Sequence, residues 1–141
     1  KGRVNVMTIG WAQLGVVWGS PQMMVLVRPS RYTHSLLANA SHFSVCVPPA
    51  GEMLNALAFC GSKSGREYDK VRACGIDLKE GVVPGVRHIG GCQLVYQCEL
   101  SGRTDLKAEA ISGTVRGKYY PSGDLHTLFF GKIMRAENFQ K

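Results

Sequence analysis

The chain has 141 residues, of which 45% are hydrophobic and 19% are charged, and its formal net charge is +7. This composition excludes a disordered or low-complexity chain, and the length indicates a single domain over residues 1–141. No apolar run approaches the roughly 18 residues of a membrane-spanning helix and no secretory signal pattern is present, so we expect a cytoplasmic protein without a membrane partner.

The positive charge is unevenly distributed along the chain. Residues 1–51 contain four cationic side chains and no Asp or Glu: Lys1, Arg3, Arg28 and Arg31. This half of the chain therefore favours an anionic ligand. Nucleic acid is disfavoured as that ligand, because the arginines are few and no basic run alternates with aromatic residues as in single-strand binders.

The cysteines do not form a metal-binding pattern. There are five, with no Cys-x-x-Cys pair and no His at metal-ligand spacing: Cys46, Cys60, Cys74, Cys92 and Cys98. We therefore predict no metal site. Three of these cysteines lie in strand-like runs, where a free cysteine usually acts as a small buried hydrophobic residue.

The first predicted element is a strand over Val4–Trp11, whose side chains alternate between two faces. Residues 1–3 before it are typical of the second half of a hairpin, so we expect a preceding strand that this chain lacks. Thr8 and Gly10 leave one face nearly bare, which lets a flat ligand approach the backbone. The alternative is a bend or bulge at Gly10.

The segment Ala12–Ser20 is predicted to be a loop, and it is unusually apolar for one. Its large side chains are Leu14, Val16, Val17 and Trp18. Such a loop either packs under another element or meets a partner chain.

A candidate anion site follows the next predicted strand, Gln22–Val27. Pro29 ends this strand, and a helix is predicted over Tyr32–Ala40. Ser30 is expected to cap the helix, so that backbone N–H groups gather there with the guanidinium groups of Arg28 and Arg31 and two hydroxyls. Phosphate is the ligand that suits this group best. The alternative is that Ser30 only caps the helix and the arginines are solvated.

A second candidate anion site lies at residues 60–70, between predicted helices over Glu52–Cys60 and Arg66–Cys74. Ser64 or Gly65 is expected to cap the second helix. The segment combines serines, glycines and cations at a helix start. It is not a P-loop, because the spacing Gly-x-x-x-x-Gly-Lys-Ser/Thr is absent.

The other predicted elements are strands over Phe43–Val47, Cys92–Leu100 and His126–Arg135. Gly131 in the last of these permits a bend or a close approach. The segment Ser101–Tyr120 is expected to leave the sheet. Because strands outnumber helices, we predict an antiparallel barrel with helices inserted between its strands. A Rossmann dinucleotide site is excluded, because no Gly-x-Gly-x-x-Gly follows a strand.

Four motifs in this order resemble those of the flavin reductase-like family of the FMN-binding split barrel, and in particular its flavoredoxin-like branch. They are Asn5–Trp11 (NVMTIGW), Arg28–Thr33 (RPSRYT), Phe59–Arg66 (FCGSKSGR) with Asp69 and Lys70, and His126–Gly131 (HTLFFG). The resemblance implies a mainly β fold with inserted helices, an antiparallel Greek-key split barrel. It also implies a homodimer with FMN near the subunit interface, and in it the apolar loop becomes part of the dimer contact.

The resemblance also assigns the cofactor-binding residues. The ring of FMN is expected along the backbone of Thr8, Ile9, Gly10 and Trp11. Its phosphate is expected at Ser30, Arg31 and Thr33, with Cys60, Gly61, Ser64 and Lys70 along the ribityl and phosphate side. His126 matches a position that faces the flavin or nicotinamide in related reductases and is the catalytic candidate; the alternative is a histidine hydrogen bonded to the preceding turn.

Two functions of different classes follow from the resemblance. One is an oxidoreductase that passes reducing equivalents from NAD(P)H to flavin and on to an acceptor, with the flavin supplying the chemistry. The alternative is a flavoredoxin-like electron carrier that receives electrons from a redox protein partner. A third hypothesis, a basic barrel that binds nucleic acid, predicts no flavin and a steep salt dependence.

A further hypothesis concerns redox chemistry at Cys60. Its position near a cationic helix start is expected to lower the pKa of its thiol. The alternative, which we favour, is that Cys60 packs tightly against a ligand.

Overall fold

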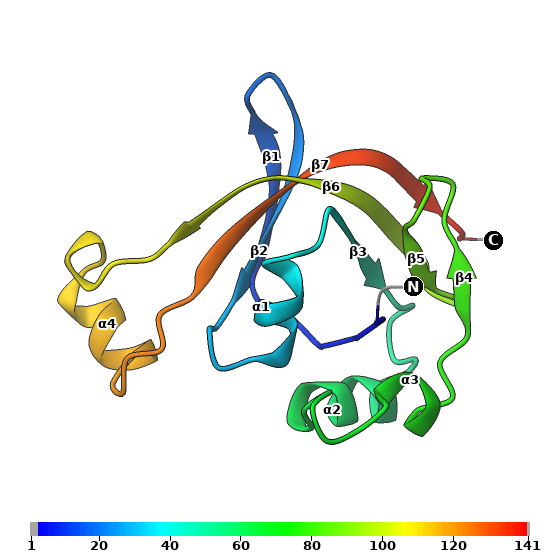
Figure 1. Cartoon of the computed structure of the whole chain (residues 1–141), viewed down its shortest axis with the longest axis horizontal. Coiled ribbons are helices and arrows are strands. Elements are labelled where there is room, and N and C mark those ends of the chain that lie inside the picture. The colour runs from blue at the N-terminus through cyan, green and yellow to red at the C-terminus, as the bar shows by residue number, and fades with distance from the viewer. Residues whose placement is uncertain (1–2, 141) are drawn as a thin grey trace.

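The computed structural model describes residues 3–140, and its main feature is one strongly curved antiparallel sheet (Figure 1). The sheet has five strands in the order β1-β2-β7-β6-β3. Their bounds are β1 Ala12–Val17, β2 Ser20–Val27, β7 Thr127–Asn138, β6 Leu94–Asp105 and β3 His42–Val47. The sheet does not close, since β1 and β3 are its two edges among the described residues. This confirms the predicted mainly β split barrel.

Short helices and a small second sheet fill the connections. The helices are α1 Tyr32–Leu37, α2 Leu54–Ser62, α3 Lys70–Ala73, the 3-10 helix η1 Ala108–Ala110 and α4 Gly113–Tyr119, and the second sheet pairs β4 Leu78–Glu80 with β5 Arg87–Ile89. The long strands β6 and β7 arch over α1, whereas α4 lies beyond their far end (Figure 1). Within residues 3–140, no helix is both long and apolar enough to cross a bilayer.

The hydrophobic core lies on the inner side of the curved sheet. Alternate side chains of β2 point into it, as expected for a strand with one buried face. The core residues are Met23, Val25, Val27, Leu37, Cys98 and Phe129. Phe129 is the largest of them and is 1% exposed.

Gly131 in β7 allows a close approach, as predicted. A Cβ at this position would overlap the ring of Phe43 and come within 2.8 Å of the Cβ of Cys98. Beside it, the pairing of β6 with β7 shifts register twice, between Gln97 and Cys98 and between Leu100 and Gly102. Such irregularities increase the local twist, which helps the sheet to curl around its core.

The predicted loop over Ala12–Ser20 is wrong, because this segment forms the hairpin β1–β2. Trp18 and Gly19 are its two loop residues, with φ of 53° and 69°. Positive φ at both positions is the geometry of a type I′ turn, which matches the twist of paired strands. All six residues of β1 are exposed, so the apolar side chains remain on the surface of the hairpin.

The predicted strand over Val4–Trp11 is also wrong. This segment is extended, but residues 4–11 join no ladder with the described part of the chain. The alternation of side chains indicated an extended backbone correctly, but a strand also needs a paired neighbour. The strand expected before residue 1 lies outside the described residues, so that expectation stays a prediction.

Helix boundaries differ from the prediction in the second half of the chain. The helix predicted over Arg66–Cys74 is reduced to α3, because Asp69 rather than Ser64 or Gly65 caps it by accepting a hydrogen bond from Arg72 N (3.1 Å). The segment Ser101–Tyr120 leaves the sheet later than expected, since β6 continues to Asp105.

Candidate functional site

The extended N-terminal segment passes between α1 and α2 and is hydrogen bonded to both sides. The amide of Asn5 donates to Oγ1 of Thr33 (2.9 Å), and the hydroxyl of Thr8 donates to the carbonyl of Leu57 (2.6 Å). Glycines allow this close packing: a Cβ at Gly65 would overlap the Asn5 side chain, and one at Gly61 would touch Thr8. The segment therefore brings the two predicted anion sites onto one pocket.

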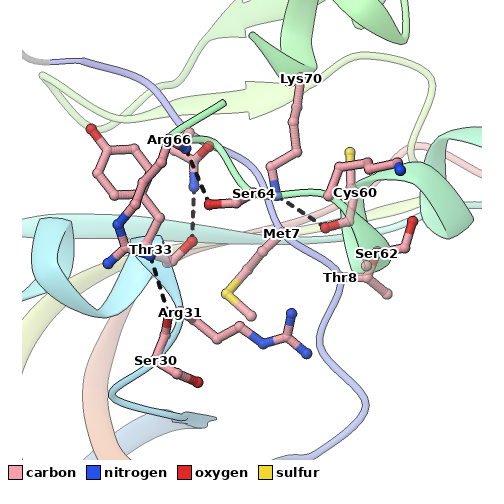
Figure 2. Close-up of a pocket in the computed structure, with 14 residues that line it drawn as sticks. Met7, Thr8, Ser30, Arg31, Thr33, Cys60, Ser62, Ser64, Arg66 and Lys70 are labelled. Atoms are coloured by element: carbon pink, nitrogen blue, oxygen red, sulfur yellow. Dashed lines mark hydrogen bonds between the residues drawn. The ribbon is translucent and has the colours of Figure 1, made fainter. Parts of the chain in front are cut away.

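This anion pocket has a volume of about 180 Å³ (Figure 2). It is lined by Asn5, Met7, Thr8, Ser30, Arg31, Tyr32, Thr33, Cys60, Gly61, Ser62, Lys63, Ser64, Arg66 and Lys70. Four of these side chains are cationic and none is acidic. Within residues 3–140, none of the four cations forms an ion pair with a carboxylate. Such a pocket suits an anion with several oxygen acceptors.

Lys70 is the most buried of the four cations, with 4% of its surface exposed. Its Nζ donates to the carbonyl of Cys60 (3.0 Å), as Figure 2 shows. Burial lowers the pKa of Lys70, and the guanidinium of Arg31 adds to this effect. An ammonium has three donors, and Lys70 uses one of them for the carbonyl of Cys60, so an anion in the pocket would supply the further partners that offset its burial.

Arg66 and Tyr32 form the outer wall of the pocket. The guanidinium of Arg66 lies over the Tyr32 ring, 5.3 Å from its centroid, and donates to the carbonyl of Ser30 (3.2 Å). The N–H of Arg66 donates to Oγ of Ser64 (3.2 Å). These contacts connect the two predicted anion sites directly (Figure 2).

Ser30 does not cap α1, contrary to the prediction. The cap position is Arg31, without a side-chain hydrogen bond. Instead, the N–H and hydroxyl of Ser30 both donate to the carboxylate of Asp124 (3.1 and 2.6 Å). Burial opposes ionisation of Asp124, but these two bonds and nearby Arg28 lower its pKa overall. Ser30 thus lines the pocket while both its donors are engaged elsewhere.

A larger cavity of about 1,090 Å³ adjoins the anion pocket. Ile9, Gly10 and Trp11 line it together with apolar side chains of β2 and β3, and Thr8, Thr33 and Cys60 line both cavities. A Cβ at Gly10 would meet no atom within 4 Å. The bare face predicted for this segment is therefore open. The backbone also bends at Gly10, as the alternative interpretation expected, but it forms no bulge because the segment is not in a ladder.

His126 lines neither cavity. Its ring is buried, with Nδ1 hydrogen bonded to the hydroxyl of Tyr120 (2.6 Å), and it packs on Trp11 with ring centroids 4.9 Å apart. The ring of Tyr119 contacts the ring of Trp11 edge-on, and their centroids are 5.1 Å apart. The structure thus places His126 behind a residue of the larger cavity rather than at its surface.

Replacing His126 with Asn is expected to make the fold less sensitive to acid. Burial lowers the pKa of His126 from 6.5, with Arg28 contributing, so the folded chain binds this proton more weakly than the unfolded chain does. Stability from this group is complete above pH 6.5 and is lost as the pH falls through the folded pKa. Urea unfolding at pH 7 and pH 5 measures the difference: the variant should lose less stability than the wild type between them.

The matched control for this measurement is His42→Asn, which alters a histidine outside the cluster, hydrogen bonded to Ser41 (2.8 Å). This control removes a histidine without altering the contacts of His126 with Trp11 and Tyr120. An unchanged pH dependence in His126→Asn would contradict the assignment.

The hypothesis that the thiol of Cys60 has a lowered pKa is wrong. Cys60 lies in the last turn of α2 rather than at a helix start, because α2 extends to Ser62. Burial raises the pKa of its thiol to about 11, and neighbouring Cys74 contributes. Its thiol is therefore protonated at neutral pH.

Six pocket residues were not among the predicted site residues: Asn5, Met7, Tyr32, Ser62, Lys63 and Arg66. All of them fall within the sequence motifs, so the motifs located the pocket at the level of segments. Arg66 carried the strongest signal, as a cation beside a glycine and a serine in a predicted anion site.

Comparisons with known proteins agree with this architecture. The flavin reductase like domain family matches residues 1–140. An uncharacterised protein of Archaeoglobus fulgidus is 32% identical over 133 residues, which are 94% of this chain and 64% of that protein.

Two solved structures are similar in fold. An FMN-binding protein from Thermus thermophilus, solved with bound 1-cyclohex-2-enone, is 29% identical with a TM-score of 0.72, and the match covers 96% of this chain and 64% of that one. Flavoredoxin from Methanosarcina acetivorans is 27% identical with a TM-score of 0.73, covering 98% and 63%. The chain thus spans less than two thirds of the length of these relatives. The family match extends over nearly the whole chain, and the chain belongs to the flavin reductase-like family.

Proposed function

We propose that the protein binds FMN and acts as an oxidoreductase of flavin reductase type, passing reducing equivalents from NAD(P)H to flavin and on to an acceptor. One observation carries this proposal: a cationic pocket without acidic residues opens beside a larger, mostly apolar cavity, and both lie along one extended backbone segment. A ligand with a phosphate at one end and a flat ring system at the other fits this pair of cavities.

The phosphate of FMN fits the anion pocket. Arg31, Thr33, Ser64 and Lys70 are the proposed phosphate ligands, and Ser30 shapes the wall while Asp124 holds it in place. Charge-assisted hydrogen bonds of this kind contribute roughly 1.5–3 kcal/mol each.

The flavin ring fits the larger cavity. We propose that it lies along Thr8, Ile9, Gly10 and Trp11, with the ribityl chain near Cys60 and Gly61, where the two cavities meet. When bound, the flavin accepts a hydride or electrons. The protein positions it, keeps water from one face with apolar side chains and balances its negative charge with the pocket cations. His126 acts by positioning Trp11.

The exposed hairpin β1–β2 supports a homodimer. Leu14, Val16 and Trp18 are 54%, 75% and 66% exposed, and apolar side chains at such exposure on neighbouring positions mark an interaction surface. We propose that a second copy of the chain covers this surface.

A second candidate function is a flavoredoxin-like electron carrier without a nicotinamide site. The similarity to flavoredoxin from Methanosarcina acetivorans favours it. Both functions need bound FMN, but they differ in the electron donor.

The experiment is to mix the purified protein with equimolar FMN, desalt it and record its visible absorption spectrum. Flavin absorption that stays with the protein supports both candidates, and a colourless protein overturns both. Steady NADPH or NADH oxidation in the presence of free flavin then supports the reductase. Reduction of the bound flavin only by a redox protein donor supports the carrier.

A further inference from the structure

Two thiols meet beside the anion pocket, which Cys60 lines. The Sγ atoms of Cys60 and Cys74 are 4.0 Å apart, close to van der Waals contact, and both cysteines are free. Cys60 lies in the last turn of α2, and Cys74 is the C-terminal cap of α3. The chain between them, residues 61–73, is the loop that supplies Gly61, Ser64 and Lys70 to the pocket.

We propose that Cys60 and Cys74 are a modification site: a hydroperoxide oxidises them to a reversible disulfide that closes the anion-pocket loop. The contact between the sulfur atoms leaves no room for another atom between them. A disulfide bond is about 2.05 Å long, so its formation requires the two sulfur atoms to approach by about 2 Å.

The reaction proceeds in two balanced steps. Cys74 is the less buried of the two residues, and its thiolate attacks one oxygen of the hydroperoxide. The O–O bond breaks, the sulfur becomes a sulfenic acid, and the departing hydroxide of hydrogen peroxide takes up a proton to give water. The Cys60 thiolate then attacks the sulfur of Cys74, the S–O bond breaks, and the departing hydroxide takes up a proton to give a second water. One peroxide thus accepts the two electrons that the two thiols lose.

The second step depends on ionisation of Cys60. Burial raises the pKa of this thiol to about 11, while the Lys70 ammonium acts in the opposite direction. Disulfide formation should therefore become faster between pH 7 and pH 9, because the thiolate fraction of Cys60 rises with pH.

The disulfide acts on the pocket through Lys70. In the reduced chain, the hydrogen bond from Lys70 to the carbonyl of Cys60 connects the two ends of the loop. A covalent bond between Cys60 and Cys74 holds the same ends together, so it opposes opening of the loop around a bound phosphate. This consequence, unlike disulfide formation itself, rests on the proposed binding of FMN.

The other cysteines provide internal comparisons. Cys98 is fully buried, and burial raises its pKa to about 12, so it should remain reduced in the native protein. Cys92 and Cys46 are also neighbours, so they are the alternative pair that could form a disulfide. Peptide mapping distinguishes the two pairs.

The test treats the native chain with a stoichiometric amount of hydrogen peroxide, alkylates the remaining thiols after denaturation and maps the peptides by mass spectrometry. We expect one crosslink, between Cys60 and Cys74, with the loss of two hydrogen atoms and full reversal by a phosphine reductant. Cys74→Ser should abolish the crosslink, whereas Cys98→Ser should retain it. Free Cys60 and Cys74 after treatment, or a crosslink only between other cysteines, would overturn the proposal.

A second measurement, release of FMN from the reduced and oxidised protein, tests the effect on the pocket. We expect FMN to be released on the order of tenfold more slowly after oxidation. This change corresponds to only part of the free energy by which a disulfide closing a loop of this length usually stabilises a protein. Equal release rates would overturn the closure of the loop. If the crosslink is mapped but neither form binds FMN, the proposed function fails and the thiol pair stands.

Discussion

Replacing Lys70 with Met is expected to weaken FMN binding by about 30- to 100-fold, because one charge-assisted hydrogen bond to a buried partner is lost. Lys70 is the most buried cation of the anion pocket, so its interaction with phosphate is the least screened by solvent. Met keeps the length and apolar stem of the side chain. Titration of the variant with FMN, followed by quenching of flavin fluorescence, measures the change.

The same substitution is expected to leave the ligand-free fold equally stable or more stable. Burial lowers the pKa of Lys70, which means that the charged form is held at a cost in the folded chain. The unfolded chain retains this proton to a higher pH, so wild-type stability gains from Lys70 as the pH rises toward 10.5, and the variant lacks that gain. Urea unfolding of both proteins without ligand at neutral and alkaline pH measures this effect.

The matched control is Lys79→Met, which removes an exposed lysine of β4. The Nζ of Lys79 forms an ion pair with Oδ2 of Asp77 at 2.8 Å and lies outside the anion pocket. FMN affinity should not change in this control. Wild-type affinity in Lys70→Met would show that the buried ammonium does not bind the phosphate.

Replacing Phe129 with Ala is expected to lower the free energy of unfolding by about 3–5 kcal/mol, the usual cost of removing a buried phenyl group from a core. Phe129 is 1% exposed and lies in one core cluster with Val25 of β2, Leu37 of α1 and Cys98 of β6, so the surrounding side chains belong to three different elements and cannot all move into the space. Urea or thermal unfolding measures the loss.

Phe139→Ala is the control for this substitution. Phe139 follows β7, is 49% exposed and stacks on His88. Its replacement should cost much less than that of Phe129. Similar losses in both variants would mean that the core is not centred on β2 and β7.

The sequence predicted the strands whose local pattern of apolar residues already indicates that they are buried. In β2, the side chains of Met23, Val25 and Val27 point to the core with the period of two that the sequence shows. The long strands β6 and β7 were found at the correct places, although each extends further than its apolar part. The polar end of each strand is held by pairing with the apolar part of the other strand, which no local pattern reveals.

The hairpin β1–β2 and the segment 4–11 could not be separated by pattern. Both segments are apolar and extended, but only one has a paired neighbour. The decisive feature is the turn at Trp18 and Gly19, where a tryptophan occupies a positive φ that sequence rules assign to Gly, Asn or Asp.

The sequence predicted which segments supply the candidate site, but not how these segments come together in space. The motifs marked both anion sites, yet their union depends on contacts such as Asn5 with Thr33 and Arg66 with Ser30, which are distant in sequence. Ser30 was misjudged for the same reason: its partner, Asp124, lies 94 residues further along the chain.

The most direct measurement of the proposed cofactor site compares the affinities for FMN and riboflavin, which differ only in the phosphate. Fluorescence titration of the purified protein with each flavin gives both dissociation constants under identical conditions. We expect FMN to bind at least about 100-fold more tightly, because the pocket offers its phosphate several charge-assisted hydrogen bonds. Equal affinities for the two flavins would contradict the assignment of the cationic pocket to the phosphate.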